Sequence, residues 1–126
     1  MEKPVYFDHI EAHVSDIQKY CNFLVKLFQG GKHKKINDNG TSMYVSPDDL
    51  AIEIKKRASD VLPIESGICM PCIRLENPED HICNTLGLKI DKSFPLPEGS
   101  VYFFTDHENI VWHAKSYIHK DQFIEF

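Results

Sequence analysis

At 126 residues, the chain is long enough for one domain, or for two small modules that share a core. Hydrophobic residues make up 42% and charged residues 26% of it, as in ordinary soluble globular proteins. The formal net charge of −5 argues against a nucleic-acid partner, and no apolar run approaches the roughly 18–20 residues that cross a bilayer. We therefore expect a cytoplasmic protein that has no membrane partner.

The N-terminal stretch predicts a strand over residues 5–14 that runs directly into a helix over residues 16–28. Side chains alternate across a strand, so one of its faces is apolar and the other polar. The apolar face carries Ile10, Ala12 and Val14, and the polar face carries His9, Glu11 and His13. Ser15 or Asp16 is suited to cap the helix, and two glycines, Gly30 and Gly31, are suited to end it. The polar face is thus the part of this element that is available for chemistry.

Three further strands complete the first half of the chain, and we place them at residues 32–37, 41–46 and 50–56. The last of these alternates cleanly, with Leu50, Ile52 and Ile54 on one face and Ala51, Glu53 and Lys55 on the other. The first half therefore predicts a βαβββ module.

The same order recurs after a linker at residues 57–66. We expect a strand at 67–75, a helix from Asn77 to about Leu86, and strands at 89–92, 100–105 and 110–115, before a tail at 117–126. The predicted fold class is α+β. A single domain of residues 1–126 would contain two βαβββ modules, at about 4–56 and 67–116, related by a pseudo-twofold axis. Their mixed, curved sheets would form a cleft, with the helices outside.

Several short motifs resemble the vicinal-oxygen-chelate superfamily, which includes glyoxalases, bleomycin- and fosfomycin-resistance proteins and extradiol dioxygenases. The segment His9-Ile-Glu-Ala-His-Val-Ser-Asp16 is similar to the opening strand of that family, and Leu50-Ala-Ile-Glu-Ile54 looks like its fourth strand. Residues 99–113 are similar to its closing hairpin. The resemblance implies that each module gives two metal ligands, one from its first strand and one from its fourth. The four positions are His9, Glu53, Met70 and His113.

Met70 stands where the family commonly has histidine or glutamine, and a thioether is a poor ligand for hard or borderline ions. The expected metal set is therefore His9, Glu53 and His113, which suits Zn²⁺, Ni²⁺, Mn²⁺ or Fe²⁺. Glu11 or His13 is available as a replacement ligand from the same face. Lys55 or Arg74 is instead available to pair with Glu53, which would leave a ligand pocket without metal.

The resemblance implies three kinds of function, each with a small-molecule substrate or ligand. The first is a divalent-metal-dependent lyase or isomerase acting on a small oxygen-bearing substrate, with Glu53 or Glu11 as the catalytic base. The alternatives are a metal-free drug- or metabolite-binding protein of the bleomycin-resistance type and an extradiol-type dioxygenase. The substrate pocket is expected at His13, Met70, Cys72 and Arg74, in a homodimer.

Overall fold

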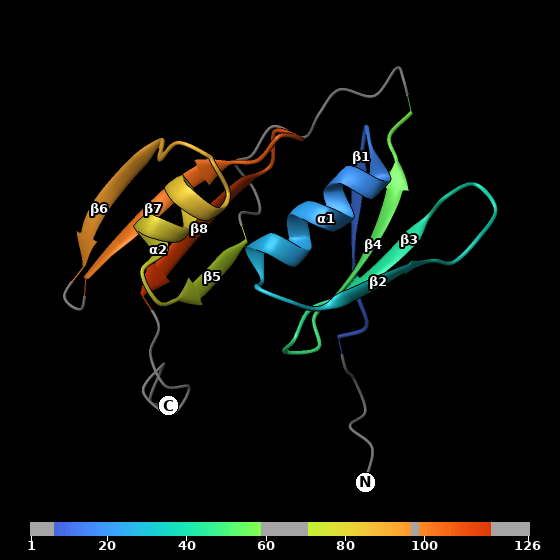
Figure 1. The fold of residues 1–126 in the computed structure, drawn as a ribbon, viewed down its shortest axis with the longest axis horizontal. Helices are drawn as coiled ribbons and strands as arrows, with labels where there is room; N and C mark the ends of the chain where they lie inside the picture. Colours follow the sequence, from blue (N-terminus) through green and yellow to red (C-terminus); the bar gives the residue numbers. More distant parts are fainter. Residues whose placement is uncertain (1–6, 59–70, 97–98, 117–126) are drawn as a thin grey trace, which may run out of the picture. The chain divides into compact units, whose positions relative to one another are not determined.

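The computed structural model describes residues 7–58, 71–96 and 99–116. The chain divides into two compact units, Met1–Leu62 and Pro63–Phe126, and each is described here by itself. Each unit contains a four-stranded mixed sheet with helical residues across one face (Figure 1). Within the described part of the chain, every helix is too short or too polar to span a membrane.

The first unit follows the predicted βαβββ order. Its elements are β1 (Ile10–Val14), α1 (Ile17–Leu27), β2 (Lys32–Lys35), β3 (Ser42–Val45) and β4 (Ala51–Lys56). The strands lie side by side in the order β1-β4-β3-β2, and only the β1–β4 pair is parallel. This topology places the first and last strands of the unit next to each other.

The core of the first unit forms between α1 and one face of its sheet. Asp16 caps the helix, because its side chain accepts a hydrogen bond from the Lys19 backbone N–H at 3.0 Å. The Tyr44 hydroxyl donates to the Gly30 carbonyl at 2.8 Å, just beyond the end of the helix. The fully buried side chains include Val14, Tyr20, Cys21, Leu24, Tyr44 and Ile54. Since α1 covers the apolar face of β1 and β4, their polar residues lie on the opposite face.

The second unit repeats the topology of the first. Its strands are β5 (Cys72–Leu75), β6 (Lys92–Leu96), β7 (Gly99–Thr105) and β8 (Val111–Ser116), in the order β5-β8-β7-β6. Its helical segment is α2 (Pro78–Asp80), which continues as a π-helical turn, η1 (His81–Thr85). The predicted pair of βαβββ modules is therefore confirmed. The cleft between the modules and the pseudo-twofold axis stay predictions.

One strand boundary in the second unit differs from the sequence prediction, and so does the way the helix begins. The strand expected at 89–92 lies at Lys92–Leu96, and it includes Pro95. β6 is an edge strand, and an edge strand tolerates proline because one side of its backbone needs no partner. Asn77 precedes α2 as expected, but its backbone is left-handed (φ 50°) and its side chain makes no capping bond.

The turn before the last strand has the same hydrogen bonds in both units. In each, the backbone N–H of the first residue donates to the carbonyl of the fifth: Ser46 to Leu50 and Asp106 to Ile110, both at 2.9 Å. The side chain of the first residue in turn accepts from the backbone N–H of the fifth, at 2.9 Å from Leu50 to Ser46 and 3.0 Å from Ile110 to Asp106. The two halves thus repeat each other in detail where their sequences do not.

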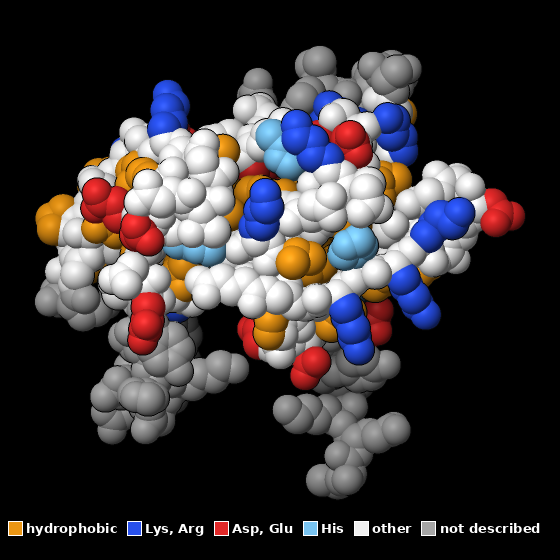
Figure 2. All heavy atoms as spheres, in the orientation of Figure 1, with side chains coloured by type: hydrophobic (Ala, Val, Ile, Leu, Met, Phe, Trp, Pro, Cys, Tyr) orange, Lys and Arg blue, Asp and Glu red, His pale blue; other side chains and the backbone are white. Residues whose placement is uncertain are grey.

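The edge strand β2 carries a dense positive charge. Lys32, Lys34 and Lys35 are exposed, and Figure 2 shows lysine and arginine side chains projecting along this edge. Lysines on an edge strand discourage pairing with another chain's strand.

Candidate metal and ligand site

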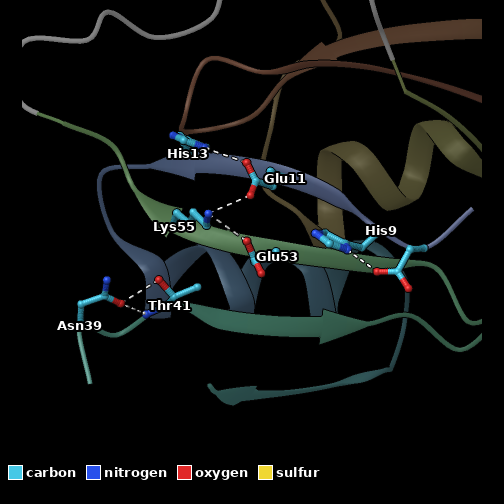
Figure 3. Close-up of polar contacts among 8 residues, drawn as sticks. His9, Glu11, His13, Asn39, Thr41, Glu53 and Lys55 are labelled. Carbon is cyan, nitrogen blue, oxygen red and sulfur yellow. Dashed lines mark hydrogen bonds and ion pairs between the residues drawn. The ribbon is translucent and has the colours of Figure 1, made fainter. Parts of the chain in front are cut away.

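The polar face of β1 and β4 brings four charged or titratable residues together. The parallel register pairs Glu11 with Glu53 and His13 with Lys55. Figure 3 shows these side chains on one face of the two strands, with His9 beside Glu53 at the start of β1. Since α1 occupies the other face, the alternation read from the sequence is what exposes this cluster.

Lys55 connects the two carboxylates. Its Nζ lies 2.8 Å from Glu11 Oε1 and 3.2 Å from Glu53 Oε1. Hydrogen bonding to Lys55 first, then to Glu53 and His13, lowers the pKa of Glu11 to about 2. The same contact with Glu11, followed by that with Glu53, raises the pKa of Lys55. Of the two partners considered for Glu53, the structure thus confirms Lys55.

His9 is oriented by a carboxylate that the sequence analysis missed. Its Nδ1 lies 2.6 Å from Asp8 Oδ2, and this hydrogen bond is the main cause of a raised pKa for His9. The contact engages Nδ1 and leaves Nε2 to face a cation, an arrangement common in metal sites. The adjacency of Asp8 and His9 in the sequence was the only signal for it.

Three ligand atoms in the first unit are close enough to share one metal ion. One atom each from His9, Glu11 and Glu53 lies within 4.8 Å of the others. An imidazole with two carboxylates is a donor set that suits borderline and hard divalent ions. The residues present therefore fit a metal. The set includes Glu11, which the sequence offered only as a replacement ligand.

His113 lies on β8 of the second unit, and its convergence with His9 and Glu53 stays a prediction. Its register partner on β5 is Cys72, just as Glu53 on β4 has Glu11 on β1 as its register partner. The ring stacks on Phe103 with centroids 5.2 Å apart, and its Nδ1 is buried with no hydrogen-bond partner among the described residues. Burial, and then the charge of Lys115, lowers the pKa of His113.

The residues predicted for a substrate pocket fall in both units. His13 Nε2 lies 3.4 Å from Glu11 Oε2 in the first unit. In the second, Cys72 is exposed and Arg74 donates to the Ser116 carbonyl at 3.0 Å. Met70 lies outside the described residues. Their role in binding stays a prediction.

A pocket of about 550 Å³ lies elsewhere in the second unit, beside its helical segment. It is lined by residues of α2 and η1 together with Tyr102 and Ser116, which are not the residues that the sequence suggested. Because Tyr102 faces α2, its neighbour Phe103 points to the opposite face of the sheet.

Comparison by sequence finds no protein-family model and no curated protein that match the chain. Comparison by structure finds strong matches. One is a fosfomycin resistance protein, FosX, from Listeria monocytogenes, at 17% identity and a TM-score of 0.71 over 95% of this chain and 99% of that one. Another crystal structure of FosX, complexed with Mn(II) and 1S,2S-dihydroxypropylphosphonic acid, matches at 18% and 0.69 over 94% and 96%.

A glyoxylase/bleomycin resistance protein/dioxygenase domain from Frankia sp. EAN1pec matches at 17% identity and a TM-score of 0.66 over 94% of this chain and 96% of that one. At such identities the likeness is one of fold. It agrees with the order of elements and the sheet topology of both units. The chain therefore has the fold of the vicinal-oxygen-chelate superfamily, the family that its sequence resembles.

Proposed function

We propose that the protein is a divalent-metal-dependent lyase or isomerase that acts on a small oxygen-bearing substrate. The observation that carries the proposal is the convergence of His9, Glu11 and Glu53 ligand atoms within 4.8 Å. The Mn(II) bound to the FosX protein of the same fold supports it.

Three residues would hold the ion: His9, Glu11 and Glu53. A bound divalent cation supplies Lewis-acid polarisation of a substrate oxygen. Asp8 holds the His9 ring by its Nδ1, so the ring is oriented before a cation arrives. Lys55 balances the two carboxylates, and it would have to give up these contacts to a bound cation.

The two carboxylates differ in their exposure. The Glu53 side chain is 16% exposed and that of Glu11 43% exposed. Either one that is not engaged by the ion would be placed to act as the catalytic base.

Metal content tests the proposal directly. Wild-type protein, loaded with Mn²⁺ or Zn²⁺ and dialysed, is expected to keep about one ion per chain by elemental analysis. His9→Ala and Glu53→Ala are expected to lose the ion and keep the circular dichroism spectrum, because neither residue belongs to the core beneath α1. His107→Ala, an exposed histidine in the turn before β8, is the matched control. Equal metal content in wild type and His9→Ala would contradict the proposal.

A second candidate is a metal-free binding protein for a small molecule. The contact of Lys55 with both carboxylates favours it, since the ammonium already neutralises much of their charge. In that case the wild-type protein retains no stoichiometric ion after loading. The group of ligand atoms that converges in the first unit contains one histidine, which does not match the two-histidine set of an extradiol-type dioxygenase.

The homodimer stays a prediction, and it is compatible with either function. A unit with a four-stranded sheet is small, and small domains bury a limited share of their surface. Sedimentation velocity at tens of micromolar is expected to give a dimer, and a monomer would contradict this expectation.

A further inference from the structure

The second sheet has an aromatic surface on the face opposite α2. Phe103 on β7 and His113 on β8 are register partners, and their rings are stacked at an interplanar angle of 16°. Phe94 on β6 meets Phe103 edge to face, with centroids 6.0 Å apart. Phe94 is 49% exposed, which is unusual for a phenylalanine in a strand. Three rings thus form a continuous surface with an open side.

The same face is positively charged. Lys92 places its Nζ 4.9 Å from the centroid of Phe103 and 5.7 Å from that of Phe94. Arg74 and Lys115, which are register partners on β5 and β8, add two more cations on this face. Among the residues of β5–β8 on this face, no carboxylate is present. Asp91, just before β6, accepts from Thr105 and lies 4.0 Å from Lys89.

His113 contributes a flat aromatic ring to this surface. Its Nδ1 is buried and lacks a partner among the described residues, and the ring packs against Phe103. The first unit is different, because the equivalent of His113 there is Glu53, beside Glu11 and Lys55. The two sheets therefore present different chemistry from matching positions.

We propose that the surface formed by Lys92, Phe94, Phe103 and His113, with Arg74 and Lys115 beside it, binds a small aromatic carboxylate. The ligand's ring would lie against the exposed side of Phe94 and Phe103, where aromatic pairs are favourable beyond the apolar area that they bury. Its carboxylate would pair with the Lys92 ammonium, which already lies over the rings. The inference goes beyond the proposed function and does not depend on it, because the surface lies within the second unit and binding there needs no metal.

Binding of benzoate to the metal-free full-length protein, in the presence of EDTA, tests this proposal. Titration followed by ¹⁵N NMR is expected to shift the amides of β6, β7 and β8. Benzamide keeps the ring without the charge, and propionate keeps the charge with a small apolar group. Both are expected to bind at least about fivefold more weakly than benzoate, the size of one exposed charge interaction. Equal affinity for benzamide and benzoate would overturn the proposal.

Two variants and one control locate the binding surface. Lys92→Met and Phe94→Leu change exposed side chains, and each is expected to weaken benzoate binding by about fivefold while the fold is kept. Lys89→Met removes the same charge from a lysine just before β6 and is expected to leave affinity unchanged. Loss of binding in Lys89→Met equal to that in Lys92→Met would overturn the proposal, as would no binding by the wild type.

The outcome is separable from that of the proposed function. Benzoate binding with no metal retention would leave this inference standing and remove the metal-dependent enzyme. Metal retention that depends on His9, without benzoate binding, would do the reverse.

Discussion

Glu11 and Glu53 are register partners on the parallel strands β1 and β4, and a single ammonium, that of Lys55, contacts both. Two carboxylates on adjacent strands repel each other unless a cation lies between them. Lys55 supplies that cation from within the fold. A divalent ion at the same place would have to compete with it, so Lys55 sets how tightly the site binds metal.

Replacement of Lys55 by methionine is therefore expected to raise metal affinity. Lys55→Met keeps the length of the side chain and removes the charge that competes with the ion. The gain should be about tenfold, since two partly exposed ion pairs are removed. Isothermal titration with Mn²⁺ measures it, and Lys26→Met on α1 controls for the change in net charge. Weaker binding in Lys55→Met would show that Lys55 supports the ion instead of competing with it.

Metal binding should depend on pH through His9. The Asp8 contact raises the pKa of His9, so the protonated ring and its pairing with Asp8 are present below about pH 6.5 and are lost as the pH rises through the raised value. A metal needs the neutral ring, so affinity should already fall above pH 6.5 as the solution is acidified.

In Asp8→Asn this loss should begin at lower pH, and affinity at pH 8 should drop by about tenfold because the ring is no longer oriented. NMR titration of the His9 ring and calorimetry at two pH values check both parts. An unchanged pKa for His9 in Asp8→Asn would contradict the assignment.

Asp106 is expected to be a major source of stability in the second unit. It is buried, and it accepts hydrogen bonds from the backbone of Glu108 at 2.8 Å and from the Trp112 indole at 2.9 Å, besides the one from Ile110. Asp106→Ala removes the acceptor of these three hydrogen bonds and should cost about 2–4 kcal/mol in the free energy of unfolding.

The matched control is Ser46→Ala in the equivalent turn of the first unit, where one hydroxyl accepts from Leu50. It should cost about 1 kcal/mol. Urea denaturation measures both, and a loss in Asp106→Ala no larger than in Ser46→Ala would refute the prediction.

Gly31 is expected to be irreplaceable in the loop after α1. Its φ is +93°, and a Cβ there would lie 2.5 Å from the Tyr44 hydroxyl and 2.6 Å from the Val45 carbonyl oxygen. Gly31→Ala should cost about 2–4 kcal/mol, because both backbone strain and a clash with the core result. Gly87→Ala is the control, since Gly87 also has a positive φ (+67°) but nothing within 4 Å. It should cost about 1 kcal/mol by thermal or urea denaturation. An equal loss of unfolding free energy in Gly31→Ala and Gly87→Ala would contradict the prediction, because it would mean that the core moves to accommodate the added methyl group.

The sequence predicts which side chains share a face of a strand, but it does not predict which residues of neighbouring strands contact each other. Alternation in β1 and β4 placed Glu11 and Glu53 on the polar face correctly, because a period of two is visible in a single strand. The register that sets Glu11 opposite Glu53 depends on residues about forty positions apart in the sequence. The sequence therefore offered either Lys55 or Arg74 as the partner of Glu53, and it did not predict that Lys55 contacts both carboxylates. β6 lies at Lys92–Leu96, whereas the sequence predicted residues 89–92. A strand that contains Pro95 is hard to predict from sequence, because proline is tolerated here only through the edge position of β6.

The matching loops Ser46–Leu50 and Asp106–Ile110 also fix which residues reach the polar faces. Each loop joins the last two strands of its sheet, so its length determines how β4 and β8 are aligned with their neighbours. A single residue inserted into either loop would turn every side chain of the following strand to the other face. Glu53 or His113 would then point at the helix, and Ile54 or Ala114 at the open surface. Mutagenesis that varies loop length therefore offers a way to invert one sheet of this protein at a time while its composition stays almost unchanged.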